Sequence, residues 1–411
     1  MTPTARIRLR RACTAAAAAG VLLAPAAAGP AYGSPDAARP TAAAPSPDPG
    51  DRDFPELTPA VAAKLDAAIR NTLREAKVPG VIVGLWAPGK GSYVKTFGVA
   101  DKETGARMRT DFYTRIGSQT KTFTVTALLR LVDQGKAGLD DPIGRYVSGV
   151  PNGDRITLRE LAGMRSGLFN YSEDDAFDKA LTTGGTRPFT PRQLLDYSFR
   201  HPVNFAPNAE FEYSNTNLVL LGLVIEKVTG RPLQEVIKEQ VIEPAGLHHT
   251  FFPTSAAFPF PHAQGYTDQS ASGDIVNATD WNPSWAWAAG AMISDLEDLR
   301  SWAKTLATGT LLKPATQAQR LKTTSVGIPG AGYGLGLFDV QGWIGHNGSL
   351  PGYESLGVYL PEERATLVVI LNTDVLHDGQ EPSTLFGEAV TSIVTPDHVY
   401  PGHKPTAPRH D

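Results

Sequence analysis

The sequence predicts an α/β (α+β) fold in which an antiparallel sheet flanked by helices is built from both ends of the chain, with a mostly helical domain inserted between them. Strand-like runs of β-branched and aromatic residues occur at 81–86 and 93–98, and again at 354–360 and 365–371. Apolar residues with helical spacing dominate the region between these runs. Because strand-like segments enclose the helical ones, we expect the two chain ends to share one sheet.

The composition fits one large folded domain and excludes several classes of protein. The chain has 411 residues, of which 41% are hydrophobic and 19% are charged, so it can bury a core. Its net charge of −4 provides no basic excess, and we expect no nucleic-acid partner. The single cysteine is Cys13, close to the start. A disulfide framework, a zinc ribbon and a cysteine nucleophile in the core are therefore excluded.

Residues 1–33 are predicted to be a signal peptide. Four arginines precede a short apolar stretch at 15–28 that is broken by Pro25, and the segment ends in Ala31-Tyr32-Gly33. The apolar stretch is too short to span a bilayer, so we expect a secreted, extracytoplasmic protein without stable membrane insertion. A disordered N-terminus or a retained anchor is the alternative, and the sequence leaves the export route open between Sec and Tat. The rest of the chain is divided into a Pro/Ala-rich linker at 34–52, a folded domain at 53–396 and a tail at 397–411.

The first helix and hairpin follow from local signals. Thr58-Pro59 is typical of a helix start, and an apolar residue recurs at every fourth position from Val61 to Leu73. Residues 88–91, Pro-Gly-Lys-Gly, separate the first two strand-like runs and predict a turn between them.

Further helices are predicted where helical apolar spacing stops at a glycine. Three such segments cover 118–134, 218–228 and 296–306, and a short helix is expected from Ser383. The mostly helical domain is placed at about 141–289, between the two sheet-forming ends.

Ser-x-x-Lys is the catalytic motif that remains after the others are excluded. The sequence contains no Gly-x-Ser-x-Gly, no His-Glu-x-x-His and no Walker phosphate loop. The remaining motif can form an acyl-enzyme only if the lysine amine lies beside the serine hydroxyl and takes its proton. It occurs three times, as Ser92/Lys95, Ser118/Lys121 and Ser301/Lys304.

Ser118 is the copy whose surroundings suit that chemistry. The first copy lies in a predicted strand with its side chains on opposite faces, and the third lies on the polar face of a helix. Ser118 instead opens a helix, with Lys121 one turn later on the same side. The free N–H groups at the helix start would stabilise an oxyanion. An ordinary N-cap serine is the alternative.

Two further segments carry groups that such a nucleophile needs. Tyr213 precedes a predicted helix and can relay protons, and Asn215 can hold a substrate amide. His346-Asn347-Gly348-Ser349 leads into a predicted strand, and its glycine permits close backbone approach. The N–H of Ser349 can pair with the N–H of Ser118 as an oxyanion hole. A buried tyrosine, a capping asparagine and a structural histidine are the alternatives.

In these three motifs the sequence resembles the serine β-lactamase and penicillin-binding protein superfamily, most of all its branch of class C β-lactamases and D-alanyl-D-alanine carboxypeptidases. The motifs are Ser118-Gln119-Thr120-Lys121, Tyr213-Ser214-Asn215 and His346-Asn347-Gly348, in that order. The resemblance implies a β-lactamase/transpeptidase-like fold, with the active site between a sheet domain and a helical domain.

The resemblance also implies a role for each motif. Ser118 would be acylated, with Lys121 and Tyr213 acting as general base and acid. No metal or organic cofactor is implied. The substrate-binding residues would be Asn215, His346, Asn347 and Gly348.

The expected function is a secreted serine hydrolase that acts through an acyl-enzyme, most like a D-alanyl-D-alanine carboxypeptidase on cell-wall peptides. A class C-like β-lactamase or esterase of the same fold is one alternative, and a non-catalytic penicillin- or peptidoglycan-binding protein is another. We expect a monomer with a small-molecule or peptide substrate, namely a cell-wall peptide, a β-lactam or an ester. Two departures from the family bear on the substrate. The third motif has His346 and Asn347 where many members have Lys and Thr, and no Lys or Arg occurs between Lys322 and Arg364 to hold a carboxylate.

Overall fold

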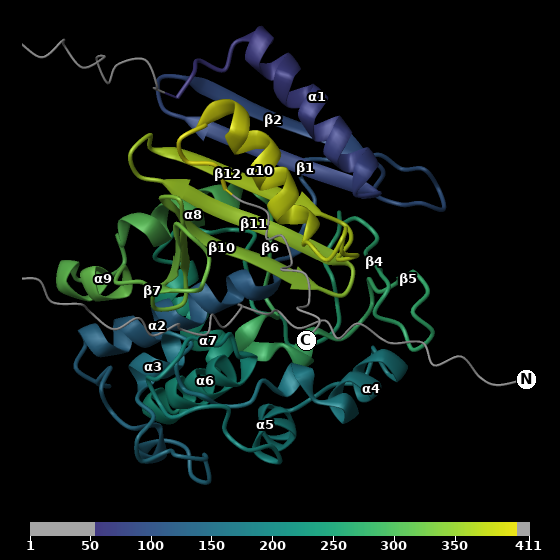
Figure 1. Ribbon diagram of the computed structural model, residues 1–411. Coiled ribbons are helices and arrows are strands. Elements are labelled where there is room, and N and C mark those ends of the chain that lie inside the picture. Colours follow the sequence, from purple (N-terminus) through teal and green to yellow (C-terminus); the bar gives the residue numbers. More distant parts are fainter. Residues whose placement is uncertain (1–53, 401–411) are drawn as a thin grey trace, which may run out of the picture.

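A computed structural model describes residues 54–400. Its main feature is an antiparallel sheet of eight strands in the order β2-β1-β12-β11-β10-β9-β8-β7. β1 (Gly80–Ala87) pairs with β2 (Gly91–Gly98) on one side and with β12 (Ala365–Leu371) on the other. The purple and yellow ends of the chain therefore lie side by side in the sheet (Figure 1). This arrangement confirms the predicted fold class.

The other half of the sheet comes from strands that the sequence patterns did not all reveal. β11 was expected, whereas β10 was not, because its glycines and polar residues interrupt any β-rich run. These strands are β11 (Tyr353–Leu360), β10 (Trp343–Leu350), β9 (Phe338–Val340), β8 (Ala331–Tyr333) and β7 (Thr324–Ser325). Two small sheets pair β3 (Thr114–Arg115) with β6 (Ile293–Ser294) and β4 (Tyr266–Thr267) with β5 (Val276–Asn277).

Helices cover both faces of the large sheet. α1 (Pro59–Glu75) and α10 (Pro382–Val394) pack together on one face, and α8 (Leu296–Thr308) packs on the other (Figure 1). The Thr58 hydroxyl accepts the backbone N–H of Val61, so the predicted start of the first helix is confirmed. α10 is longer than the short helix expected from Ser383.

The helical layer lies beside the sheet and is organised around two buried helices. α2 (Thr120–Asp133) and α6 (Asn215–Thr229) pack against each other, and both expose almost no apolar side chain to solvent. Together with α8 they join one continuous core that reaches the sheet face. The other helices are α3 (Leu158–Ala162), α4 (Asp175–Thr183), α5 (Pro191–Phe199), α7 (Leu233–Ile237) and α9 (Pro314–Arg320).

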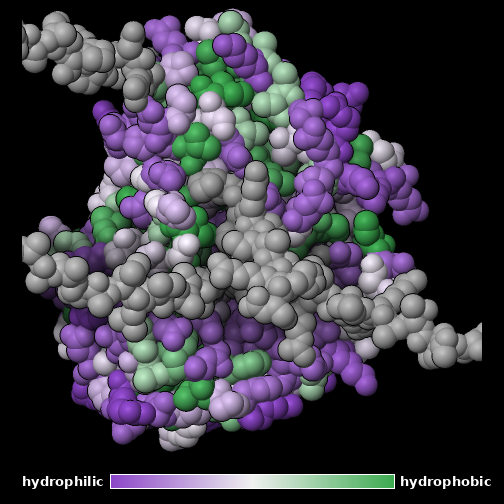
Figure 2. Space-filling view, viewed as in Figure 1, coloured by the Kyte–Doolittle hydropathy of each residue, from purple (hydrophilic) through white to green (hydrophobic). Residues whose placement is uncertain are grey.

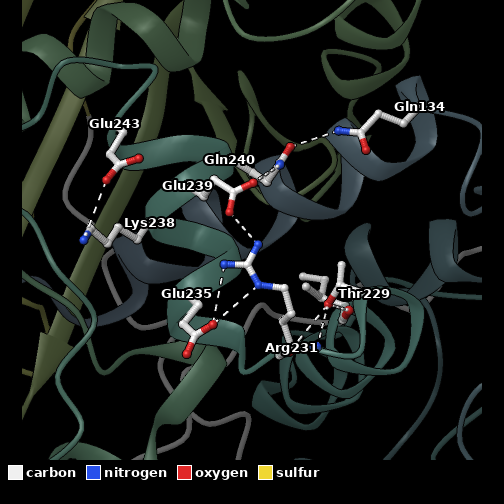
Figure 3. Close-up of polar contacts among 9 residues, drawn as sticks. Gln134, Thr229, Arg231, Glu235, Lys238, Glu239, Gln240 and Glu243 are labelled. Carbon is white, nitrogen blue, oxygen red and sulfur yellow. Dashed lines mark hydrogen bonds and ion pairs between the residues drawn. The ribbon is translucent and has the colours of Figure 1, made fainter.

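The outer surface of the helical layer is polar. Arg231 forms ion pairs with Glu235 and Glu239, and Gln240 ties this segment to Gln134 just beyond α2 (Figure 3). Exposed pairs of this kind contribute little to folding free energy. In the view of Figure 2, hydrophobic residues form only small separate groups among hydrophilic ones.

Several sequence predictions concern residues outside the described range. The predicted signal peptide (1–33), the linker (34–52) and residues 401–411 of the predicted tail all lie there. Within residues 54–400, no helix combines the length and the apolar character that a membrane crossing requires.

Candidate active site

Ser118 lies where the helical layer meets the sheet. It occupies η2 (Gly117–Gln119), a single 3-10 turn that runs directly into α2. Gly117 has a φ of +54°, which favours glycine, and a Cβ there would stand 2.5 Å from the backbone nitrogen of Ser349. The turn is thus pressed against β10, while the Ser118 side chain stays partly exposed and within reach of a ligand.

Lys121 is buried beneath this serine. Its Nζ donates to Ser118 Oγ over 2.9 Å and to the carbonyl oxygen of Ala289 over 2.8 Å. The second contact holds the amine in place from a segment that is distant in sequence. The distance to Ser118 is what proton transfer from an attacking hydroxyl requires.

Tyr213 brings a phenol ring to the same place from the extended segment before α6. The ring centroid lies 4.8 Å from Lys121 Nζ, and the side chain is only 8% exposed. Its ring also packs against the rings of Tyr333 and Phe338. The first two motifs therefore converge on Ser118.

His346 completes the group from β10. Its ring centroid is 6.1 Å from that of Tyr213, and the side chain is buried. Nδ1 lies 2.5 Å from the carbonyl oxygen of Asn347, which can only accept, so Nδ1 carries the proton. Nε2 is then the acceptor that faces the Tyr333 hydroxyl at 3.4 Å. Burial and the charge of Lys121 lower the pKa of His346 to about 3, which leaves the ring neutral near pH 7.

The backbone of β10 closes the site from the sheet side. β9 pairs with β10 only as far as Gly345, so within the described residues no strand covers the edge from His346 to Leu350. A Cβ on Gly348 would collide with the carbonyl oxygen of Ile116 and stand 3.0 Å from the nitrogen of Ser118. The backbone nitrogens of Ser118 and Ser349 therefore lie close together, as an oxyanion hole requires.

Gly348→Ala is expected to lower kcat about 100-fold, because the new methyl group would push β10 away from Ser118 and separate the two N–H donors. Steady-state kinetics on the folded variant measures this loss. Gly184→Ala is the control, since its Cβ would meet no atom closer than 3.2 Å. Unchanged kcat in Gly348→Ala would show that the strand tolerates the shift.

The two asparagines of the motifs are held by other side chains. Asn215 is the first residue of α6, and its amide donates to Ser172 Oγ over 3.1 Å. Asn347 points to the opposite face of the sheet from His346 and donates to the carboxylate of Glu381, at the start of α10. Substrate contact by Asn215 and Asn347 stays a prediction. Asn347 would have to reach the substrate from the face of the sheet opposite to His346.

The other two Ser-x-x-Lys copies lie on the surface. Ser92 and Lys95 are exposed on β2, where Lys95 pairs with Asp66 at 2.7 Å. Ser301 and Lys304 are exposed on α8. Neither lysine has the buried contact with serine that Lys121 makes.

Three contributors to the site were given no role from the sequence. Tyr333 faces His346, and its Tyr-Gly-Leu-Gly context was the available signal. Ala289 acts through its backbone carbonyl, which carries no sequence signature. Gln119 donates to Ser355 Oγ over 2.7 Å, and that hydroxyl donates to the carbonyl of Ile116, which anchors the turn that carries Ser118 on β11.

One group of potential metal ligands occurs among residues 54–400, and it does not include any residue of the three motifs. His249, Asp295 and Asp298 place one ligand atom each within 4.8 Å of one another. Asp298 already accepts the N–H of His249 and the hydroxyl of Thr250, and Asp295 caps α8. These carboxylates therefore have structural partners.

Family comparison agrees with this geometry. The family model described as Beta-lactamase matches residues 65–388, which include all three motifs. The chain belongs to the Beta-lactamase family. This membership confirms the resemblance to serine β-lactamases and penicillin-binding proteins. It also confirms the β-lactamase/transpeptidase-like fold that the resemblance implies.

Known relatives of this Beta-lactamase family member include amidohydrolases. A D-stereospecific amidohydrolase from Streptomyces sp. is 32% identical, with a TM-score of 0.71 over 82% of this chain and 97% of that chain. A D-amino acid amidase from Ochrobactrum anthropi SV3, complexed with L-phenylalanine amide, is 29% identical, with a TM-score of 0.69 over 83% and 96%. Protein flp of Staphylococcus aureus is 27% identical over 75% of this chain, which spans only 62% of that protein.

Proposed function

We propose that this serine hydrolase cleaves the amide or ester bond of D-amino acid derivatives through an acyl-enzyme on Ser118, and that its preferred substrates carry no carboxylate next to the scissile bond. The observation that carries this proposal is that the third motif places His346, buried against the rings of Tyr333 and Phe338, at this position. In many members of the superfamily a lysine stands at this position.

The chemical steps follow from the contacts of the site. Ser118 Oγ attacks the substrate carbonyl carbon while the amine of Lys121, which must be uncharged for this step, takes the Ser118 proton over the 2.9 Å contact. The carbonyl oxygen becomes negative and is stabilised by the N–H groups of Ser118 and Ser349. Tyr213, beside Lys121, delivers the proton to the leaving amine or alcohol. Water then attacks the acyl-enzyme by the same route in reverse.

The aromatic cluster around Tyr213 influences which leaving groups are favoured. It contains His346, Tyr333 and Phe338, whose rings pack edge to face with one another and contact the Tyr213 ring. A neutral imidazole in this aromatic cluster offers no positive charge to a carboxylate, and the Asn347 amide is engaged by Glu381. A carboxylate placed there without a positively charged partner would lose the free energy of its hydration. An uncharged amide or ester would avoid this cost of desolvation.

The relatives support the same preference. Two structures that match almost their full length to this chain are named as a D-stereospecific amidohydrolase and a D-amino acid amidase. Carboxypeptidase activity on D-Ala-D-Ala peptides and β-lactamase activity stay predictions, and the geometry of the third motif favours neither.

Substrate comparison tests this proposal directly. We expect kcat/KM for D-phenylalanine amide to exceed that for a diacetyl-L-Lys-D-Ala-D-Ala peptide by at least about tenfold, because a desolvated carboxylate without a partner costs more than 1.4 kcal/mol. We also expect the D enantiomer of the amide to be preferred over the L enantiomer, as the names of the two matched structures suggest. Nitrocefin is assayed in parallel as the β-lactam substrate. Faster turnover of the carboxylate-terminated peptide would contradict the proposal, whereas loss of all activity in Ser118→Ala controls for contaminating hydrolases.

We also propose that the protein acts outside the cytoplasm as a monomer. The N-terminal sequence pattern supports export, and the site is complete within one chain. Sequencing of the mature N-terminus and light scattering of the purified protein test these two statements.

A further inference from the structure

The first turn of α10 is connected to the strand that carries the oxyanion donor. Asn347 on β10 donates from its side-chain amide to the carboxylate of Glu381, which directly precedes α10. Along β10, Asn347 is flanked by His346 and Gly348, which face the active site, and Ser349 follows two residues later. The Asn347 side chain is thus a tether on the back of the strand, directly behind the residues that line the site.

A second connection joins the same helix turn to the neighbouring strand. Glu354 on β11 lies directly opposite Ser349 in the ladder. Its side chain is fully buried, and its Oε2 accepts the backbone N–H of Ser383 over 2.8 Å. Both strands around Ser349 are therefore attached to the start of α10, one through Glu381 and one through Glu354.

These carboxylates stand in an unfavourable electrostatic environment. Burial and the nearby Glu381 and Asp374 raise the pKa of Glu354, and burial and Asp374 raise that of Glu381. Within residues 54–400, no basic side chain forms an ion pair with Glu354 or Glu381. A helix needs only a serine, threonine, aspartate or asparagine as its cap, and Glu381 makes no capping bond with its side chain. Capping therefore does not account for a glutamate at this position.

We propose that Glu381 is a positioning residue for the oxyanion hole. It holds Asn347 and thereby keeps the Ser349 N–H of β10 where it can donate to the same oxygen as the Ser118 N–H. The inference rests on the acyl-enzyme function proposed above. Because β9 pairs with β10 only as far as Gly345, no strand in the described part of the chain restrains the edge of β10 that faces the Ser118 turn, and the Asn347 tether supplies a restraint from the sheet face instead.

A kinetic double-mutant cycle on the full-length protein tests this role. Glu381→Ala and Asn347→Ala are each expected to lower kcat about 10- to 100-fold, less than outright loss of an oxyanion donor, with KM changed by no more than about twofold. The double variant is expected to be no worse than either single one, since both remove the same tether. Glu381→Gln keeps an acceptor for Asn347 and is expected to restore kcat to within about threefold of wild type.

The controls separate this inference from a structural effect and from the proposed function. Glu75→Gln, on the exposed surface of α1 over the same sheet face, is expected to keep wild-type kcat. Melting curves establish that each variant is folded at the assay temperature, and Asn347→Ala serves if Glu381→Ala does not fold. Wild-type kcat in folded Asn347→Ala, or additive losses in the double variant, would overturn the inference. An inactive wild type would instead refute the proposed function.

Discussion

Ser118→Ala is expected to lower kcat by about four orders of magnitude or more and to abolish covalent labelling by a fluorescent penicillin and by a fluorophosphonate. Without the hydroxyl no acyl-enzyme forms, and only binding and the oxyanion donors remain to assist attack by water. Labelling followed by mass mapping of the modified peptide measures the effect.

The chain supplies a matched control for this substitution. Ser301→Ala removes an exposed serine from an identical Ser-x-x-Lys spacing on α8, and it is expected to leave labelling and kcat unchanged. The Ser118 side chain is in contact with the buried Lys121 amine, so the folded state of the variant is checked by its melting curve. Label that persists in Ser118→Ala, or that maps to Ser92 or Ser301, would refute Ser118 as the nucleophile.

Lys121→Met is expected to slow acylation about 1,000-fold, within the range attributed to a positioned general base. Methionine preserves the length and burial of the side chain but cannot accept the proton of Ser118. The Ala289 carbonyl also loses its donor, which costs about 1 kcal/mol of folding free energy. Stopped-flow measurement of acyl-enzyme formation isolates this step from deacylation.

Lys304→Met is the corresponding control, because that lysine is exposed on α8. Its acylation rate is expected to equal that of the wild type. If Lys121→Met acylated at a rate within about threefold of wild type, the base would have to be another group, and Tyr213 would be next in line because its ring lies beside the amine.

The substrate preference and the position of β10 are linked through Asn347. In this protein the residue between His346 and Gly348 is directed to Glu381 rather than to the substrate side. The contact between Asn347 and Glu381 would keep the Asn347 amide away from a substrate carboxylate. The same contact would hold β10, the strand that carries the Ser349 N–H, in place. The Glu381 and Gly348 variants therefore probe one strand from its two faces.

Local sequence signals were sufficient for much of the fold. The Thr58-Pro59 cap, the apolar period of α1 and the strand-like runs at both chain ends each depend on neighbours within a few residues. β10 was missed because its residues serve the site and the buried tether instead of a β-rich pattern. The start of α2 differs slightly, since Ser118 sits in a 3-10 turn before the helix proper.

For the site, sequence alone determined which residues carry chemistry: a serine and a lysine one turn apart, a tyrosine before a helix, and a histidine and glycine before a strand. Their roles stay predictions, but the tertiary structure brings the four side chains into one group. Only that structure decided that His346 is neutral, that Ala289 holds Lys121 and that Glu381 holds Asn347. Each of these depends on burial or on a partner far away along the chain, and neither has a signature in the local order of residues.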